Sequence, residues 1–434
     1  MLVVTKFGGS SLSCATQFEK VKNIIESDAK RKIVVVSALG KRDPKDTKIT
    51  DLLYILHAHL RYSVPYEEIW TMIVERFCAI RKDLAIAYPI EEDLSSLSEE
   101  LHKGIALDYL VSRGEYFTAK LMSSYLGYPF VDAKEIIRFG YDGKLDESET
   151  EKAVKQAFMR YGSMVVPGFY GAYPDGSIKL LSRGGSDVTG SILSKCLKVS
   201  LYENWTDVSG ILAADPRIIF QPKCIREITY AELRELSYMG ANVLHEETVF
   251  PVQELNIPIN LKNTNDPQHP GTLIKNECED QDTIVTGLAG KKEFMAFNIF
   301  KTHMSNQVGF LRKTLSIFEK YGVSVEHLPS GIDSFSVVVS DDSAEQCQYE
   351  IIMDLKKELN ADVTVDHDLA LIAVVGRNMV HKYGLCGTIF QTLGKEKINI
   401  KLLAQGPSEL NIIIGIARKD YENSLRALYK NLLA

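Results

Sequence analysis

The stretch Lys6–Ser11 (Lys-Phe-Gly-Gly-Ser-Ser) most constrains the fold of this chain, because it joins a strand to a helix through two glycines. The apolar residues Leu2–Val4 before it predict a short buried strand, and the apolar spacing of Phe18–Ile25 after it is helical. Glycines let a ligand approach the backbone, and main-chain N–H groups at a helix start favour an anion, most often phosphate. Tight packing alone also explains such a turn, so both interpretations stay open.

Strands and amphipathic helices alternate over the first part of the chain. Strands are predicted at Ile33–Val36, Pro129–Asp132, Met164–Phe169 and Val199–Asn204, and helices at Asp51–His59, through the seventies, and at Tyr116–Leu126. This alternation predicts an α/β fold with a mostly parallel sheet covered by helices on both faces. Ligands of such sheets bind at the carboxyl ends of strands, where Lys6, Ser37, Asp207 and residues 183–187 fall.

The organisation changes near Leu273, after which residues 276–292 carry several charges and no helical face, as a linker does. Two similar units follow, and their landmarks recur 75 residues apart: helix starts at Gly309 and Gly384, strands at Val323–Val325 and Ile398–Ile400, and strands at Phe335–Val337 and Leu410–Ile412. Such a fixed offset predicts a duplicated unit of ferredoxin-like order, strand-helix-strand-strand-helix-strand. The predicted domains are 1–275, a linker at 276–292, 293–367 and 368–434.

Composition excludes several classes of protein. A length of 434 residues suffices for two or three domains, and a net charge of -7 without a long basic run argues against a nucleic-acid partner. The longest apolar run, Leu369–Val375, is too short to cross a bilayer, and glycines interrupt the N-terminal apolar stretch, unlike a signal peptide. Seven dispersed cysteines without a Cys-x-x-Cys pair predict reduced thiols. We expect a soluble, cytoplasmic protein with no membrane partner.

Two further stretches offer ligand chemistry. Ser182–Asp187 places glycines before an aspartate that opens a helix, and Asp187 can be an N-cap or can hold a phosphoryl-transfer lysine in place. Thr206–Gly210 and Asp215–Arg217 can bind a ligand or can be turn chemistry alone. No Walker A and no Gly-x-Gly-x-x-Gly pattern is present, which disfavours several common nucleotide folds. His57 and His59 lie two apart on a predicted helix and point to different sides, so we interpret them as structural.

Together these stretches resemble the aspartate kinases of the amino-acid kinase superfamily. The resemblance runs over Lys6–Ser11, Val35–Ala38, Arg113–Glu115, Ser182–Asp187, Thr206–Asp207, Asp215–Arg217 and Gly240–His245, and the repeated C-terminal unit is similar to paired ACT domains. It implies an amino-acid kinase fold followed by two ferredoxin-like ACT domains. The implied reaction is ATP-dependent phosphorylation of the side-chain carboxylate of L-aspartate to 4-phospho-L-aspartate, the first step of lysine, threonine and methionine biosynthesis.

The resemblance also implies a role for each matched residue. Lys6 would neutralise charge on the transferring phosphoryl group and Asp187 would orient Lys6, as the catalytic pair. L-Aspartate would be bound by Ser37, Thr50, Glu115, Arg183, Gly184 and Ser186, with Arg183 on a carboxylate and Glu115 on the ammonium group. ATP with Mg²⁺ would be bound by Lys6, Gly8, Gly9, Ser10, Thr206, Asp207, Asp215, Arg217 and Asn242. No protein ligands to a metal are assigned.

The chain departs from the family pattern in three places. Leu212 stands where many members have Tyr. Asn242 replaces Lys, and Glu246 replaces Pro, in the Gly-Ala-Lys-Val-Leu-His-Pro stretch, so a positive charge is lost and weaker or rearranged ATP binding is expected. The segment Gly40–Thr47, which precedes Thr50, is longer and more charged than the usual loop.

The ACT resemblance implies feedback inhibition by an end product and pairing of chains as a homodimer or a dimer of dimers. The effector would bind at the first unit, at Met304, Gly309, Phe310, Leu311, Val325, Glu326, Ser330 and Gly331. Glu326 stands where lysine-inhibited members have an acidic residue, although a solvated strand-edge charge is the alternative. We expect lysine as the effector. Threonine, or both, stays open because His327–Ile332 departs from the Thr-Ser-Glu of some lysine-sensitive relatives.

Two other functions stay open. One is another kinase of the superfamily, acting on glutamate or a nucleoside monophosphate, against which Arg113–Glu115 and the ACT pair argue. The other is a non-catalytic amino-acid sensor with a decayed kinase lobe, which only Asn242 favours and which Lys6 and Asp187 oppose.

Overall fold

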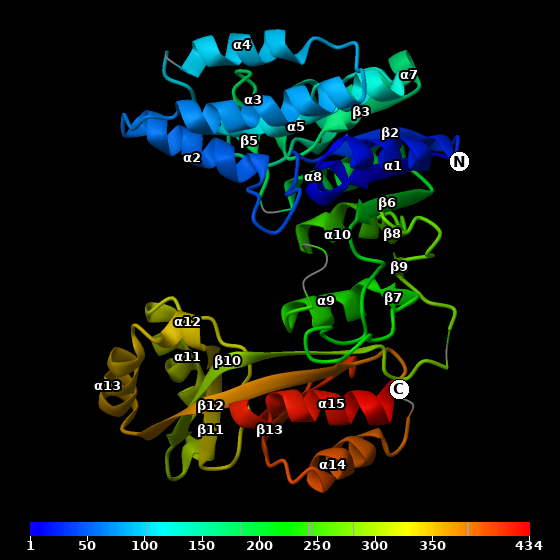
Figure 1. Cartoon of the computed structure of the whole chain (residues 1–434). Coiled ribbons are helices and arrows are strands. Elements are labelled where there is room, and N and C mark those ends of the chain that lie inside the picture. The colour runs from blue at the N-terminus through cyan, green and yellow to red at the C-terminus, as the bar shows by residue number, and fades with distance from the viewer. Residues whose placement is uncertain (102, 183, 242–243, 245, 281, 380–381) are drawn as a thin grey trace. The chain divides into compact units, whose positions relative to one another are not determined.

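The computed structural model describes residues 1–101, 103–182, 184–241, 244, 246–280, 282–379 and 382–434, and the chain forms two compact units (Figure 1). The first unit comprises Met1–Ile211, Cys224–Tyr230 and Val243–Cys278. The second comprises Leu212–Lys223, Ala231–Asn242 and Glu279–Ala434. Two short segments of the predicted N-terminal domain 1–275 therefore belong to the second unit.

A mostly parallel sheet of seven strands forms the centre of the first unit, as predicted. The strands are β1 (Val3–Phe7), β2 (Arg31–Val36), β3 (Met164–Pro167), β6 (Leu201–Thr206), β7 (Glu227–Thr229), β8 (Ile259–Asn263) and β9 (Thr272–Lys275), in the spatial order β3-β2-β1-β6-β8-β9-β7. Only the β8–β9 pair is antiparallel within the described sheet. A separate hairpin pairs β4 (Tyr170–Ala172) with β5 (Ile178–Leu180).

Helices cover both faces of this sheet because strand residues alternate between the faces. The helices are η1 (Gly9–Leu12), α1 (Ala15–Glu26), α2 (Ile49–Arg61), α3 (Glu67–Asp83), α4 (Ile90–Leu101), α5 (Leu107–Leu126), α6 (Ala133–Ile136), α7 (Glu147–Tyr161), α8 (Gly185–Leu197) and α10 (Glu246–Gln253). Phe7, Val34 and Trp205 pack in one buried cluster with residues of α1 to α5. The opposite face, which carries Lys6, meets α8. No helix in the described ranges is long and apolar enough to span a membrane.

Two predicted elements of this unit are wrong. The helix expected from Tyr116 begins at Leu107, because Leu110 and Val111 continue the buried face of α5, so Arg113–Glu115 lies inside the helix. The strand expected at Pro129–Asp132 is only one bridge between Phe130 and Val165. Asp132 instead caps α6, accepting a hydrogen bond from the Lys134 N–H.

The second unit is built on an antiparallel sheet of five strands. These are β10 (Gly287–Phe300), β11 (Ser334–Ser340), β12 (Asp362–Val375), β13 (Ile400–Gln405) and β14 (Asn411–Ile416), in the order β11-β10-β12-β14-β13. Its helices are η2 (Met304–Asn306), α11 (Phe310–Lys320), α12 (Asp341–Ala344), α13 (Gln348–Leu359), α14 (Leu385–Lys395), η3 (Arg418–Asp420) and α15 (Tyr421–Leu432). In addition, α9 (Tyr230–Tyr238) belongs to this unit from Ala231 onward.

The two long strands β10 and β12 are shared between the two predicted repeats. Their outer parts, Phe294–Phe300 and Asp362–Leu369, pair with each other and complete the core of α11 and α13. Gly287 to Lys291 pairs with Leu371 to Val375, in the part of the sheet that packs on α14 and α15. Neither repeat thus has the complete set of strands of its own that was predicted for each. In addition, β10 begins inside the predicted linker.

The two helix starts predicted 75 residues apart are both present. Gly309 caps α11 with a φ of 79° and Gly384 caps α14 with a φ of 81°, a conformation that favours glycine. The strand predicted at Val323–Val325 is wrong. The segment that follows these residues forms only isolated bridges, at His327 and Ser330, because the Pro329 imide has no N–H for a regular ladder. The second repeat has the strand β13 at the corresponding place.

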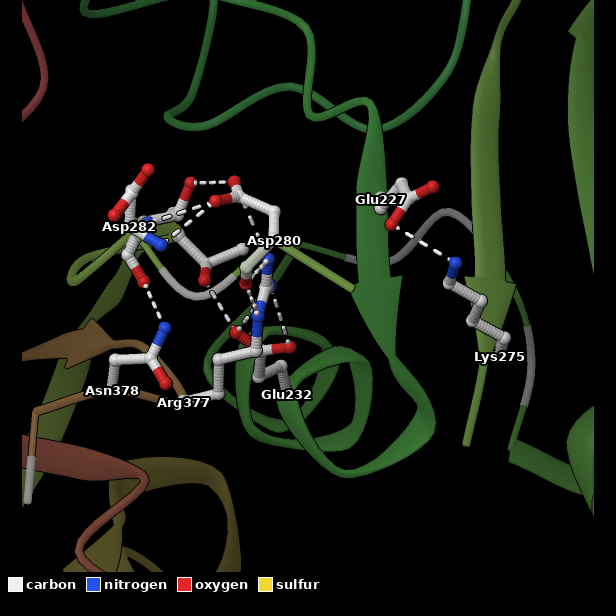
Figure 2. Close-up of polar contacts among 9 residues, drawn as sticks. Glu227, Glu232, Lys275, Asp280, Asp282, Arg377 and Asn378 are labelled. Atoms are coloured by element: carbon white, nitrogen blue, oxygen red, sulfur yellow. Dashed lines mark hydrogen bonds and ion pairs between the residues drawn. The ribbon is translucent and has the colours of Figure 1, made fainter. Parts of the chain in front are cut away.

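A buried ion pair holds α9 to the second repeat. The Arg377 guanidinium lies 3.3 Å from both carboxylate oxygens of Glu232, which is fully buried, and donates to the main-chain carbonyl of Asp280 (Figure 2). Thr286 donates its hydroxyl to the same Glu232 carboxylate. Helix α9 is therefore anchored in the second unit through Glu232.

Candidate active site

Lys6, Asp187 and Asn204 form the polar centre of the first unit. Lys6 on β1 and Asn204 on β6 are direct neighbours in parallel register, so their side chains project from the same face of the sheet. Asp187 reaches them from the first turn of α8. Its Oδ1 lies 2.5 Å from the Lys6 Nζ and 2.8 Å from the Asn204 Nδ2. Lys6 and Asn204 are buried, so the Lys6 ammonium and the Asp187 carboxylate interact in surroundings of low polarity.

Asp187 is not the N-cap of α8, although capping was one interpretation of it. Gly184 is the N-cap, with a φ of 76°, and its carbonyl accepts the Asp187 N–H at 2.8 Å. The Asp187 side chain is thereby free to turn toward the sheet while its negative charge stays favourable near the helix N-terminus. The arrangement brings the predicted pair Lys6 and Asp187 together.

The glycine turn after β1 combines tight packing with proximity to Lys6. A Cβ at Gly9 would lie 2.8 Å from the Ala38 carbonyl oxygen, so only glycine allows that approach. The Gly8 N–H donates to the Trp205 carbonyl at 2.9 Å and is already used. The main-chain amides of Gly9 and Ser10 therefore stay the predicted phosphate donors of this turn.

Glu115 is a buried carboxylic acid with unmet hydrogen-bonding capacity. It is 4% exposed, and burial raises its pKa to about 8, partly offset by the Ala38 N–H. Its Oε2 has no hydrogen-bond partner among the described residues. Burying an ionised carboxylate whose oxygen lacks a hydrogen-bond partner costs free energy unless a cation lies next to it. The site is thus suited to bind an ammonium group.

The long loop before Thr50 is held by a buried arginine that the sequence analysis missed. Arg76 on α3 donates to the carbonyls of Gly40 and Thr47, and lies 3.7 Å from the Asp46 carboxylate. Asp46 also pairs with Arg42, whose hydrogen bonds lower the pKa of Asp46. Thr50 falls in the first turn of α2 as a result.

The segment after β3 brings a second missed residue to the site. Phe169 has a φ of 78°, which is unfavourable for a bulky side chain, and its N–H donates to the Thr189 hydroxyl on α8. A Cβ at the preceding Gly168 would lie 2.6 Å from the Ser186 Cβ, so the predicted substrate residue Ser186 packs directly on this turn. The only signal in the sequence is the dipeptide Pro167-Gly168.

The predicted nucleotide contacts divide between the units. In the first unit Thr206 is the last residue of β6 and Asp207 follows it. The Thr206 hydroxyl donates to Asp207, which is exposed. In the second unit Arg217 makes a two-pronged contact with the Asp215 carboxylate, and its hydrogen bonds lower the pKa of Asp215. Arg183 and Asn242 lie outside the described residues, so their predicted roles stay predictions. Ser37 follows β2 and donates its N–H to the Phe7 carbonyl.

The predicted effector residues are partly core residues. Met304, Phe310 and Val325 pack in the hydrophobic core of the first repeat. Leu311, Ser330 and Gly331 are exposed, and the Gly309 cap stands at the start of α11. The Glu326 carboxylate accepts a hydrogen bond from the Tyr238 hydroxyl of α9. The main-chain N–H of Glu326 donates to the Val338 carbonyl at 2.9 Å. Glu326 is thus engaged and is not simply a solvated edge charge.

Comparison with known proteins gives matches along the whole chain. The profile of the amino acid kinase family matches residues 1–263, and that of an ACT domain matches residues 372–432. Aspartokinase 3 of Bacillus subtilis is 35% identical, over 99% of this chain and 98% of its own length.

Solved structures agree with these matches. The aspartate kinase of Clostridium acetobutylicum superposes with a TM-score of 0.91 at 46% identity and covers 99% of both chains. Aspartokinase III of Escherichia coli superposes with a TM-score of 0.76 over 100% of both chains. It has been solved with aspartate and ADP (26% identity) and with lysine and aspartate (27% identity).

Proposed function

This chain belongs to the amino acid kinase family, as an aspartokinase with a C-terminal ACT region, and from that premise we propose that it transfers the γ-phosphoryl group of ATP to the side-chain carboxylate of L-aspartate. The product is 4-phospho-L-aspartate. The single observation that carries the proposal is the ion pair between buried Lys6 and partly buried Asp187 at the carboxyl end of the parallel sheet, beside the glycine turn.

The proposed chemistry needs little more than positioning and fixed charge. Phosphoryl transfer has a loose transition state, so a lysine and backbone amides aimed at the phosphoryl oxygens lower the barrier by electrostatics. Lys6 has three N–H donors, of which one points to Asp187, so two can reach the phosphoryl oxygens. Asp187 orients Lys6 through their ion pair.

ATP would enter as its Mg²⁺ complex, with the metal supplying charge neutralisation on the phosphates. Mg²⁺ usually keeps several waters and takes one or two carboxylates plus the phosphates, so a dedicated protein cage is not needed. No cluster of three or more potential metal ligands occurs within the described ranges. Gly9, Ser10, Thr206, Asp207, Asp215, Arg217 and Asn242 are the proposed nucleotide contacts, with Gly8 supplying space next to Lys6.

L-Aspartate would be held by opposite charges at its two ends. Its ammonium group pairs with Glu115, whose burial and unmet Oε2 support that role. Arg183 takes a carboxylate through its planar fork. The other proposed contacts are Ser37, Thr50, Gly184 and Ser186. The complex of Escherichia coli aspartokinase III with aspartate and ADP supports this choice of substrates.

Lysine is the proposed effector, bound at the first repeat. Support comes from the Escherichia coli aspartokinase III complex with lysine and aspartate, and from a relative named lysine-sensitive aspartokinase 3 that is 29% identical over 99% of both chains. Glu326 would receive an ammonium group of lysine, in competition with the Tyr238 hydroxyl. The remaining proposed contacts are Gly309, Leu311, Ser330 and Gly331, with Met304, Phe310 and Val325 as the apolar support.

The biological setting follows from the same assignment. We propose a cytoplasmic enzyme of lysine, threonine and methionine supply, assembled as a homodimer or a dimer of dimers through its ACT domains. The edge strand β13 of the five-stranded sheet offers unpaired backbone groups to a second chain. Sedimentation as a 48.6 kDa species, with and without amino acids, would contradict the assembly.

The deciding assay is steady-state ADP release with a panel of acceptors. The proposal expects turnover with L-aspartate and none above background with L-glutamate or a nucleoside monophosphate. Turnover with another acceptor but not with L-aspartate would favour a different kinase of the superfamily. Binding of amino acids without any turnover would favour the non-catalytic sensor.

A further inference from the structure

Asn204 is a buried amide, and the proposed roles of Lys6 and Asp187 do not by themselves explain why an amide lies at this position. It is 2% exposed and shares its face of β6 with the fully buried Tyr202, whereas the buried Glu203 and Trp205 lie on the other face. Burying an amide costs free energy unless its donors and acceptors are paired, so an apolar side chain would pack at this position more favourably. The amide therefore needs a specific partner, and that partner is Asp187.

Two donors from two neighbouring strands meet on one carboxylate oxygen. The Asp187 Oδ1 receives the Lys6 Nζ at 2.5 Å and the Asn204 Nδ2 at 2.8 Å. A lone ion pair leaves the carboxylate free to rotate about its side-chain torsions. A second donor fixed on a central strand removes that freedom, and the direction in which Asp187 holds Lys6 becomes defined.

The neutrality of Asn204 matters as much as its hydrogen bond. An amide adds no charge, so the charges of Lys6 and Asp187 stay balanced and the field of Lys6 toward an incoming phosphoryl group is not weakened by a second anion. A second carboxylate in the same place would repel Asp187 and would bind a proton instead.

We propose that Asn204 is a positioning residue for phosphoryl transfer, which fixes the Asp187 carboxylate and through it the direction of the Lys6 ammonium. It does not touch the substrates. The inference rests on the proposed function, since it assigns Asn204 a task in the same reaction. It predicts that Asn204 governs turnover and leaves the binding of both substrates nearly unchanged.

The test compares Asn204→Leu and Asn204→Asp with the control Tyr202→Phe in the full-length enzyme. The control removes a neighbouring hydroxyl that donates at 3.0 Å to the main-chain carbonyl of Asp187, on the same strand, and leaves the carboxylate contacts in place. Asn204→Leu is expected to lower kcat by about 10-fold or more, with KM for aspartate and ATP changed by less than about 3-fold. Tyr202→Phe is expected to lower the melting temperature but to keep kcat within about 2-fold.

Asn204→Asp adds a readout that a purely structural role would not move. The new carboxyl lies next to Asp187, so its pKa is raised, and its protonated form can donate as the amide did. The activity of this variant relative to wild type is therefore expected to rise as the pH is lowered from about 8 to about 6. The pH dependence of Asn204→Asp also tests the positioning role of Asn204 if Asn204→Leu does not fold.

Two results would overturn the inference. One is a folded Asn204→Leu enzyme with kcat within about 2-fold of wild type. The other is an Asn204→Asp enzyme whose loss of activity is the same at every pH. Wild type without aspartate-dependent turnover, or Lys6→Ala with normal turnover, would instead refute the proposed function, so the two failures are distinguishable.

Discussion

Lys6 and Glu326 are the charged residues on which the proposed catalysis and regulation rest, and their surroundings differ. Lys6 of β1 is 6% exposed and pairs with Asp187 of α8, whose carboxylate also accepts a hydrogen bond from Asn204 of β6. Glu326 lies in a segment with only isolated bridges, and its carboxylate contacts one tyrosine hydroxyl. Catalysis benefits from charge that is fixed in advance, whereas a regulatory site needs contacts that a ligand can replace.

The largest effect that this contrast predicts is at Lys6. Lys6→Ala removes a preorganised charge, so kcat is expected to fall by about 10² to 10³-fold, or about 3 to 4 kcal/mol of transition-state stabilisation. Lys152→Ala, which removes a surface lysine near Glu149, is the matched control and should keep normal turnover. Steady-state kinetics with a melting curve for each variant makes the comparison. Near-normal turnover of folded Lys6→Ala would remove Lys6 from the mechanism.

Glu115 should show the next largest effect, on substrate binding. Glu115→Gln is expected to raise KM for aspartate by about 10-fold or more while KM for ATP stays nearly constant, because only aspartate brings an ammonium group to the buried carboxylate. Initial rates over a matrix of both substrate concentrations measure the two constants together. Equal changes in both would make Glu115 structural.

The pH dependence gives an independent check of Glu115. Its pKa is raised to about 8 in the folded protein, so the free enzyme holds it protonated below that pH. Binding an ammonium group needs the ionised form, and kcat/KM for aspartate should rise with pH up to about 8 and then level off. Glu115→Gln should lack this rise. The raised pKa also means that the folded state binds more protons than the unfolded state, so Glu115 lowers stability progressively as the pH rises from about 4.5 to about 8.

A smaller effect is expected at the regulatory site. Glu326→Ala should raise the lysine concentration for half-inhibition by about 5- to 10-fold, a loss typical of one charge-assisted contact, with uninhibited kcat unchanged. Glu345→Ala, an exposed glutamate of the same repeat, is the control. Titrations of activity with lysine and with threonine measure both. Unchanged inhibition by lysine would place the effector elsewhere, and selective inhibition by threonine would replace lysine as the effector.

The smallest predicted effect is at Tyr238, and it tests whether lysine replaces the hydrogen bond between Tyr238 and Glu326. Tyr238→Phe removes the hydroxyl that occupies Glu326, so lysine should inhibit at a concentration about 2- to 3-fold lower. A weaker inhibition in this variant would mean that Tyr238 helps to bind the effector and does not compete with it. The same lysine titration serves for this variant and for Glu326→Ala.

The sequence predicted features that depend on local pattern. The strand-turn-helix at Lys6–Ser11, the parallel sheet and the two capped helices at Gly309 and Gly384 follow from periodicity and glycine chemistry, and the structure has them. All seven cysteines are free, as their dispersed spacing indicated.

Features that depend on strand order could not be predicted in the same way. Asn204 becomes a neighbour of Lys6 only because β6 pairs with β1 across almost 200 residues of sequence. Arg76 reaches the site through the packing of α3, for which the sequence gives no signal, and Phe169 reaches it through a strained turn marked only by Pro167-Gly168. The sharing of β10 and β12 likewise depends on register along two long strands.

The most direct test of the central claim is identification of the product. Acyl phosphates react with hydroxylamine to give hydroxamates, so the purified chain is incubated with Mg-ATP, L-aspartate and hydroxylamine, and ADP and hydroxamate are both quantified. The account predicts one aspartyl hydroxamate for each ADP, none with L-glutamate, and loss of both products in Lys6→Ala. Release of ADP without hydroxamate, or without dependence on L-aspartate, would contradict it.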